Sequence, residues 1–200
     1  MKSLAPDVVD RLDTLLDMKR RYRCLYVDPP WRYDQPPRGT AENHYPTMSL
    51  HELHALPMSQ LAMPEAHLHL WVTHSFFHAG VGLLESWGFA YKSMFVWVKP
   101  QLGMGYYLRS SSEFLLLGVR GKLPFQSRSI PNWLFLPRSR HSEKPERIRT
   151  LVEQVSPGPY LELFGRKAVP GWTIFGNQVE PKSPSTSDAD LFTGSCHDEH

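Results

Sequence analysis

An acidic residue, two prolines and a tryptophan follow one another at the end of the apolar run CLYVDPPW, residues 24–31. The carboxylate of Asp28 and the backbone carbonyl of Pro29 both accept hydrogen bonds. Pro29 and Pro30 carry no backbone N–H and stiffen the turn, which would fix these two acceptors side by side. Trp31 adds a flat ring on which a planar group can stack. The stretch therefore suits a ligand with a primary aromatic amine, such as the exocyclic amine of adenine.

A proline-rich turn capped by its aspartate explains the same four residues equally well, since Asp-Pro turns are common. The position of Asp28 is compatible with a binding corner. The apolar residues before it predict a buried strand over 22–28. In an open α/β sheet, ligands bind beyond the carboxyl ends of such strands.

Apolar spacing and turn signals predict the elements that would position this corner. Helices are expected over 6–20, after the capping box of Ser49 and Glu52, from Ser75 as N-cap to a stop at Gly88, and from Pro145 to a stop at Gly158. Strands are expected over 22–28, 66–73, 91–99, 112–121 and 132–137, and in the stretches YLELFG at 160–165 and WTIFG at 172–176. The polar, turn-rich segment 35–46 is expected to be a loop. This alternation predicts the α/β class, with a mostly parallel sheet and helices on both faces.

The chain has 200 residues, of which 41% are hydrophobic and 21% charged, and this suits one globular domain with a sizeable core. We place that domain at 1–179. The tail over 180–200 is rich in Pro, Ser and Asp and is expected to be disordered. No apolar stretch approaches the roughly 20 residues that cross a bilayer, and the N-terminus lacks the apolar core of a signal peptide. Two cysteines in unrelated contexts argue against a disulfide framework. We therefore expect a soluble protein of a reducing compartment.

The net charge of +2 is unevenly distributed, because the tail is acidic and the body is basic. Basic clusters at 19–23 and 138–149 are compatible with a polyanionic partner, although solvated basic surfaces explain them as well. His141, within the second cluster, is a candidate for a phosphate or polar contact. The glycine-containing segment 103–111 resembles no dinucleotide fingerprint. It is expected to form a lid, with Tyr106, Tyr107 and Arg109 available for stacking and phosphate contact.

The ten histidines do not form a convincing metal motif. His74 and His78 lie one helical turn apart, but the helical zinc motif needs a glutamate where Ser75 stands. The other histidine pairs have no cysteine or carboxylate partners at ligand spacing. We therefore expect no metal.

Six stretches occur together in one order, and together they resemble the adenine-N6 methyltransferases. They are DPPW (28–31), YPTMSLHEL (45–53), FVWVKP (95–100), KPERI (144–148), LELFGR (161–166) and GNQ (176–178). This family includes the catalytic subunit of the eukaryotic messenger-RNA adenosine methyltransferase, and its compact bacterial and phage members are similar in size. The resemblance covers residues 24–178. It implies a Rossmann-like, S-adenosylmethionine-dependent fold with permuted motif order, in the cytoplasm of a bacterium or of a phage-infected cell.

The resemblance also implies roles for individual residues. Asp28 and Pro29 would hold the target amine, Pro30 would shape the corner, Trp31 would line the base pocket, and Tyr45 would help to close it. Lys144 would pair with the carboxylate of S-adenosylmethionine. The remaining cofactor contacts would come from Glu162, Leu163, Phe164 and Arg166 at the nucleoside end, and from Asn177 and Gln178 on the ribose hydroxyls. The chain departs from the eukaryotic members at 166–169, where a His and an Asn that follow the arginine are absent.

These observations predict methyl transfer to the N6 amine of adenine in DNA. RNA is the alternative substrate, because composition does not separate the two. A non-catalytic scaffold subunit is a second alternative, although such subunits usually lose the DPPW signature or the lysine. A binding domain for another adenine compound is a third, and it leaves the ordered stretches unexplained.

Overall fold

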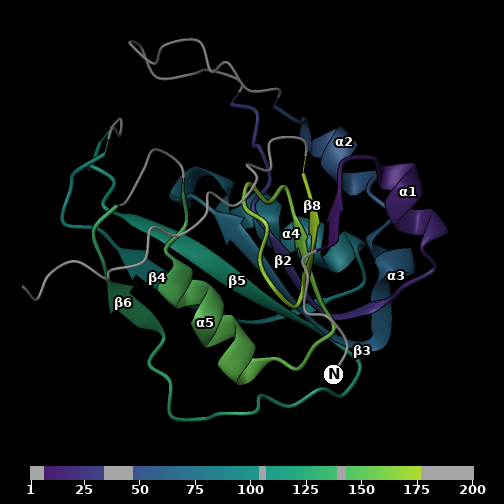
Figure 1. Ribbon diagram of the computed structural model, residues 1–200. Coiled ribbons are helices and arrows are strands. Elements are labelled where there is room, and N and C mark those ends of the chain that lie inside the picture. The colour runs from purple at the N-terminus through teal and green to yellow at the C-terminus, as the bar shows by residue number, and fades with distance from the viewer. Residues whose placement is uncertain (1–6, 34–46, 104–106, 139–142, 177–200) are drawn as a thin grey trace, which may run out of the picture.

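The computed structural model describes residues 7–33, 47–103, 107–138 and 143–176, which form an eight-stranded sheet with helices on both faces (Figure 1). The strands are β1 (Asp7–Val9), β2 (Tyr22–Val27), β3 (Ala62–Val72), β4 (Ala90–Val98), β5 (Ser112–Arg120), β6 (Trp133–Phe135), β7 (Tyr160–Leu163) and β8 (Trp172–Phe175). Their order across the sheet is β1-β8-β7-β2-β3-β5-β4-β6. All neighbouring pairs are parallel except the two that include β5. The expected α/β class with a mostly parallel sheet is confirmed.

Two apolar clusters fix the helices to opposite faces of this sheet. The helices are α1 (Leu12–Asp17), α2 (Leu50–His54), α3 (Met58–Leu61), α4 (Phe77–Ser86) and α5 (Glu146–Val155). Leu15, Leu53 and Leu83 bring α1, α2 and α4 into one cluster. Ile148 and Val152 of α5 belong to the other cluster. The prediction of helices on both faces is therefore confirmed.

Strand β2 is buried on both faces from Cys24 to Val27, which explains why these four residues read as an apolar run. Leu25 and Val27 lie in the cluster with α1 and α4. Cys24 and Tyr26 alternate with them and face α5. Asp28 is the first residue beyond this strand. It thus stands at the edge of the sheet where the carboxyl ends of the parallel strands meet.

Two expected helix starts are wrong. Residues Asp7–Val9 form strand β1, paired in parallel with β8, so the first helix covers only Leu12–Asp17. Three residues are too few to separate the helical from the strand periodicity, and pairing with β8 at the sheet edge makes this segment a strand. Ser75 lies in a 3₁₀ turn (His74–Phe76), and α4 begins after it without a side-chain cap.

Other local expectations are confirmed. Ser49 and Glu52 form both hydrogen bonds of a capping box at α2. Pro145 is the N-cap of α5. Gly88 follows α4 at a φ of +84°, a conformation that glycine adopts without strain. The expected loop over 35–46 and the expected tail over 180–200 lie outside the described residues.

Candidate active site

Backbone hydrogen bonds hold the Asp-Pro-Pro-Trp corner in place. The Trp31 N–H donates to the Pro29 carbonyl at 2.9 Å, and the Met48 N–H donates to the Pro30 carbonyl at 2.8 Å. Trp31 also forms an isolated parallel bridge with Met48. The Asp28 N–H reaches the Leu163 carbonyl of β7 at 3.4 Å. The turn is therefore anchored both to the segment before α2 and to the end of the neighbouring strand.

The Trp31 ring is part of the packing at this corner. Only 9% of the residue is exposed, and its indole N–H donates to the carbonyl of Trp71 at 3.1 Å. Its ring stacks on Phe76, with the centroids 4.8 Å apart. Tyr33 meets the same phenylalanine edge-on and is 39% exposed. The more accessible aromatic ring beside the corner is thus Tyr33, which the sequence reasoning missed.

A line of alternating charges begins at Asp28. The Lys144 ammonium lies 2.7 Å from the Asp28 carboxylate and 3.4 Å from that of Glu113, the second residue of β5. Glu113 in turn accepts a 2.6 Å hydrogen bond from Lys99, which follows β4 and whose side chain is 3% exposed. Two carboxylates and two ammonium groups therefore neutralise one another across the carboxyl edge of the sheet.

The pKa values of this group follow from burial and pairing. Burial alone would lower the pKa of Lys144, but the charges of Asp28 and Glu113 outweigh it and the net shift is upward. Burial would raise the pKa of Glu113, and the two lysines reverse this, so its carboxylate stays ionised. Lys99 differs, because burial lowers its pKa more than Glu113 raises it. The pairing thus keeps Lys144 cationic and Glu113 anionic at neutral pH.

The predicted cofactor strand ends beside this corner. Leu163 is buried, and Phe164 has a φ of +64°, in the left-handed region that is unfavourable for a residue with a side chain. A Cβ on Gly176 would lie 2.0 Å from the carbonyl oxygen of Gly165. The segments that follow β7 and β8 approach so closely that each needs a glycine there. This close approach explains the LFG and FG ends of the two strands.

Glu162, predicted as a cofactor contact, is paired with an arginine of α5. Its carboxylate is buried and forms an ion pair with Arg149 of α5. The Arg149 guanidinium also lies 5.5 Å and 5.1 Å from the ring centroids of Tyr26 and Trp172. Burial opposes its charge, but the Glu162 carboxylate raises the pKa of Arg149 overall. The pair fixes α5 to β7, and with it the position of Lys144.

Two predicted site residues are exposed, and five others lie outside the described residues. Arg109 is exposed near the base of the β4–β5 connection, where the Gly103 N–H donates to the Ser110 carbonyl at 2.6 Å. Arg166 is exposed just after the Phe164 turn. The residues that lie outside the described ranges are Tyr45, Tyr106, His141, Asn177 and Gln178.

The histidines at 67 and 69 form a buried hydrogen-bonded unit with Ser156. Nε2 of His67 donates to the Leu123 carbonyl at 2.8 Å, because a carbonyl can only accept. Its Nδ1 atom therefore accepts from the Ser156 hydroxyl at 2.9 Å. The same hydroxyl oxygen then accepts from Nε2 of His69 at 2.8 Å. Within the described ranges, no group of three or more His, Cys, Asp or Glu side chains is placed to hold a metal ion.

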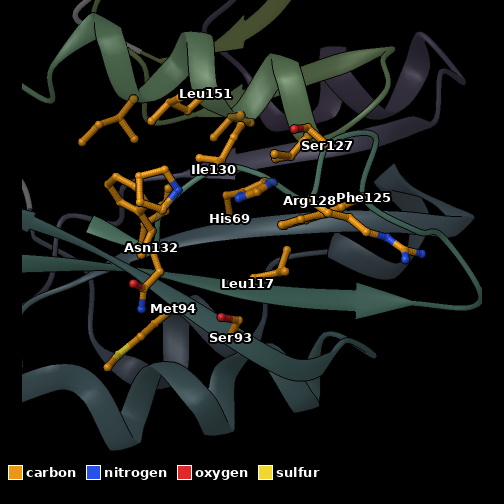
Figure 2. A pocket seen from close by; sticks show the side chains of 16 residues that line it. His69, Ser93, Met94, Leu117, Phe125, Ser127, Arg128, Ile130, Asn132 and Leu151 are labelled. Atoms are coloured by element: carbon orange, nitrogen blue, oxygen red, sulfur yellow. The ribbon is translucent and has the colours of Figure 1, made fainter. Parts of the chain in front are cut away.

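His69 also lines a cavity of about 170 Å³ between α5 and strands β4 and β5 (Figure 2). The other lining residues are mostly apolar, including Leu117, Ile130 and Leu151. Asp28 and Lys144 do not belong to this lining. The cavity is therefore separate from the charged corner.

A mostly parallel sheet, with a Pro-Pro corner after one central strand and a glycine corner after the next, defines a Rossmann-like α/β enzyme of the methyltransferase type. A model of the MT-A70 family matches residues 22–178, and the chain belongs to this family. It is therefore an adenine-N6 methyltransferase by family. No helix in the described part of the chain is long and apolar enough to cross a membrane.

Relatives of known type lie in bacteria and in eukaryotes. The type II methyltransferase M.MunI of Mycoplasma sp is 32% identical over 80% of this chain and 79% of its own length. The human N(6)-adenine-specific methyltransferase METTL4 is 30% identical over 84% of this chain but only 39% of its own. The human N(6)-adenosine-methyltransferase catalytic subunit METTL3 is 29% identical over 80% of this chain and 28% of its own length. The chain thus spans most of the bacterial relative and well under half of the human ones.

Proposed function

We propose that this chain transfers a methyl group from S-adenosylmethionine to the exocyclic N6 amine of adenine in DNA. The observation that carries the proposal is the pairing of Asp28 with Lys144 at the carboxyl edge of the sheet. The first is the acceptor expected for the amine, and the second is the cation expected for the carboxylate of S-adenosylmethionine. With these roles, their separation of 2.7 Å would hold the amine and the methyl donor next to each other.

The corner has free hydrogen-bonding capacity for an amine. Oδ2 of Asp28 accepts from Lys144, whereas Oδ1 accepts no hydrogen bond from a described residue. The Pro29 carbonyl accepts from the Trp31 N–H and keeps a second lone pair. These two acceptors would take the two N–H bonds of the amine and leave its lone pair directed at the methyl group. As the nitrogen–methyl bond forms, the methyl–sulfur bond would break to leave a neutral thioether, and the Asp28 carboxylate would accept the proton that the amine loses and pass it to solvent. The rate gain would come from alignment, as in other reactions that hold two reactants in line.

The donor set also fits S-adenosylmethionine, which supplies a methyl group already activated by its sulfonium. An ammonium has three N–H bonds. Asp28 and Glu113 use two of those on Lys144. The third would bond the carboxylate of the methyl donor, beside the Trp71 ring, whose centroid lies 5.3 Å from the ammonium.

The nucleoside end would lie beyond β7, where Leu163, Phe164 and Arg166 follow one another. Asn177 and Gln178 would bond its ribose hydroxyls, because an amide both donates and accepts. Glu162 would act indirectly, by holding α5 in place through Arg149.

DNA is favoured over RNA because M.MunI, a type II methyltransferase, matches this chain over 79% of its own length. RNA is the second candidate, which the likeness to METTL3 supports. A scaffold role is less well supported, because such a subunit has no need for the Asp28–Lys144 pair.

Methylation of matched DNA and RNA oligonucleotides with radiolabelled S-adenosylmethionine tests the proposal. We expect label in adenine of DNA with the wild type and none with Asp28→Ala. Label in RNA alone would move the assignment to the second candidate. If no label is transferred and calorimetry detects no S-adenosylmethionine binding, both the DNA and the RNA methyltransferase assignments are contradicted. That result would favour the scaffold.

A further inference from the structure

Two large aromatic side chains are exposed on strand β6 at the edge of the sheet. Trp133 is 55% exposed and Phe135 is 57% exposed. Leu134 between them packs against the cluster that contains Ile148 of α5. Because side chains alternate along a strand, the two aromatic rings point to the opposite face, on which α4 lies. Figure 1 shows β6 at the outer edge of the sheet, and among the described residues no other strand pairs with its free side.

A row of apolar side chains joins this exposed pair to the Asp-Pro-Pro-Trp corner. Phe76, on which Trp31 stacks, is followed by Phe77, and the Phe77 ring meets Phe114 of β5 edge-on at 6.3 Å. Phe114 is paired in register with Val96 of β4, and Val96 with Trp133. The row crosses the sheet on one face from the corner to the edge strand. The exposed pair is thus continuous with the candidate active site.

Cations lie where this row meets the carboxyl edge. Arg138 follows β6 and is exposed, and its backbone N–H donates to the side chain of Gln101 at 3.3 Å. Its guanidinium lies beside Gly103 in the β4–β5 connection, which also carries the exposed Arg109. Aromatic faces flanked by arginines suit a nucleic-acid strand, since the bases stack and the phosphates are neutralised. A purely apolar protein partner would not use these charges.

We propose that Trp133 and Phe135 form a stacking platform for unpaired bases that flank the target adenine. The platform rests on the proposed function, and it implies a substrate strand that is single or locally opened. Exposed aromatic residues on a sheet face bind single-stranded RNA in this way in other folds. Four strand spacings separate β2 from β6, about 19 Å, which a few nucleotides of an extended strand can span.

Oligonucleotide binding without S-adenosylmethionine measures the platform directly. We expect Trp133→Ala and Phe135→Ala each to weaken the binding of a single-stranded oligonucleotide about tenfold, and the double variant more. Trp133→Leu and Phe135→Leu remove the ring but keep an apolar side chain, and they should weaken binding as much. Val8→Ala, an exposed residue of the opposite edge strand β1, should leave binding unchanged. Unchanged S-adenosylmethionine affinity in all variants shows that they are folded.

Tryptophan fluorescence gives a second measurement, because the other five tryptophans are no more than 9% exposed. A base stacked on Trp133 should quench its emission. Trp133→Phe should retain the affinity and lose the quenching.

Unaltered oligonucleotide affinity in the double alanine variant would overturn the platform. A change in the sedimentation of the alanine variants without a change in oligonucleotide affinity would also overturn the platform. That result would assign Trp133 and Phe135 to an interface between copies of the chain. A wild-type protein that binds the oligonucleotide through Trp133 and Phe135 but methylates no adenine would contradict the proposed function alone. Methylation with no dependence on Trp133 or Phe135 would contradict the platform alone.

Discussion

The Lys144 ammonium lies 2.7 Å from the Asp28 carboxylate, although 116 positions separate the two residues. Asp28 is the first residue after strand β2, and Lys144 stands one residue before the N-cap of α5. The residue proposed to hold the target amine and the residue proposed to hold the methyl donor are therefore direct neighbours. A substitution of either residue should therefore change the charge and hydrogen bonding around the other.

Asp28→Asn tests the role of the carboxylate with almost no change in shape. The amide still accepts a hydrogen bond but carries no charge, so the amine should become a poorer nucleophile and Lys144 should lose a partner. We expect the methyl-transfer rate to fall by about 100-fold or more, on the scale of removing one key catalytic hydrogen bond. Single-turnover assays measure the rate. Calorimetry should show S-adenosylmethionine affinity within a few-fold of the wild type, and complete loss of that affinity would contradict the assignment of Asp28 to the amine.

Glu113→Gln tests the charge line through its pH dependence. The folded-state pKa of Glu113 is lowered, so its contribution to stability is present above the usual pKa near 4.5 and is lost as pH falls below that value. The variant lacks this contribution. Its unfolding free energy should therefore decrease less than that of the wild type between pH 6 and pH 3, as measured by urea denaturation. Equal decreases in the two proteins would show that Glu113 is not held ionised by Lys144 and Lys99.

The motifs predicted the corner better than they predicted its contacts. The ordered motifs shared with the methyltransferase family pointed to Asp28, Lys144 and the end of β7, and the first two are paired in the structure. The pairing of Lys144 with Glu113, and of Glu162 with Arg149, could not be predicted, since these partners come from strands and helices far apart in the chain. Strand β1 was mistaken for helix because its pairing partner, β8, lies at the other end of the chain.

Ser156→Ala tests the hydrogen-bonded unit of His67 and His69. The variant leaves Nδ1 of His67 and Nε2 of His69 without their partner in a buried site. We expect a loss of about 1–3 kcal/mol in unfolding free energy. Ser129→Ala, at an exposed serine of the β5–β6 connection, is the control and should stay within about 0.5 kcal/mol of the wild type.

The same unit should make the protein sensitive to mild acid. Burial lowers the pKa of His69 to about 3, whereas a histidine in the unfolded chain titrates near 6.5. Stability is therefore greatest above pH 6.5 and falls as the pH drops from there towards 3, because the unfolded state takes up the proton first. At pH 5.5 the expected loss from His69 alone is about 1.4 kcal/mol relative to pH 8. Denaturation at both pH values checks this, and His69→Gln should reduce the difference between them.

Gly176→Ala tests the close approach of β7 and β8 beside the proposed cofactor site. The added Cβ would lie 2.0 Å from the Gly165 carbonyl oxygen, so one strand end must move. We expect a stability loss of about 1–3 kcal/mol, as for other overpacked sites, together with weaker S-adenosylmethionine binding. Gly82→Ala is the matched control, because a Cβ there meets nothing within 4 Å. Alanine in α4 should raise the unfolding free energy by about 0.5–1 kcal/mol. Calorimetric titration of both variants decides the point: normal S-adenosylmethionine affinity in Gly176→Ala would place the methyl donor away from this corner.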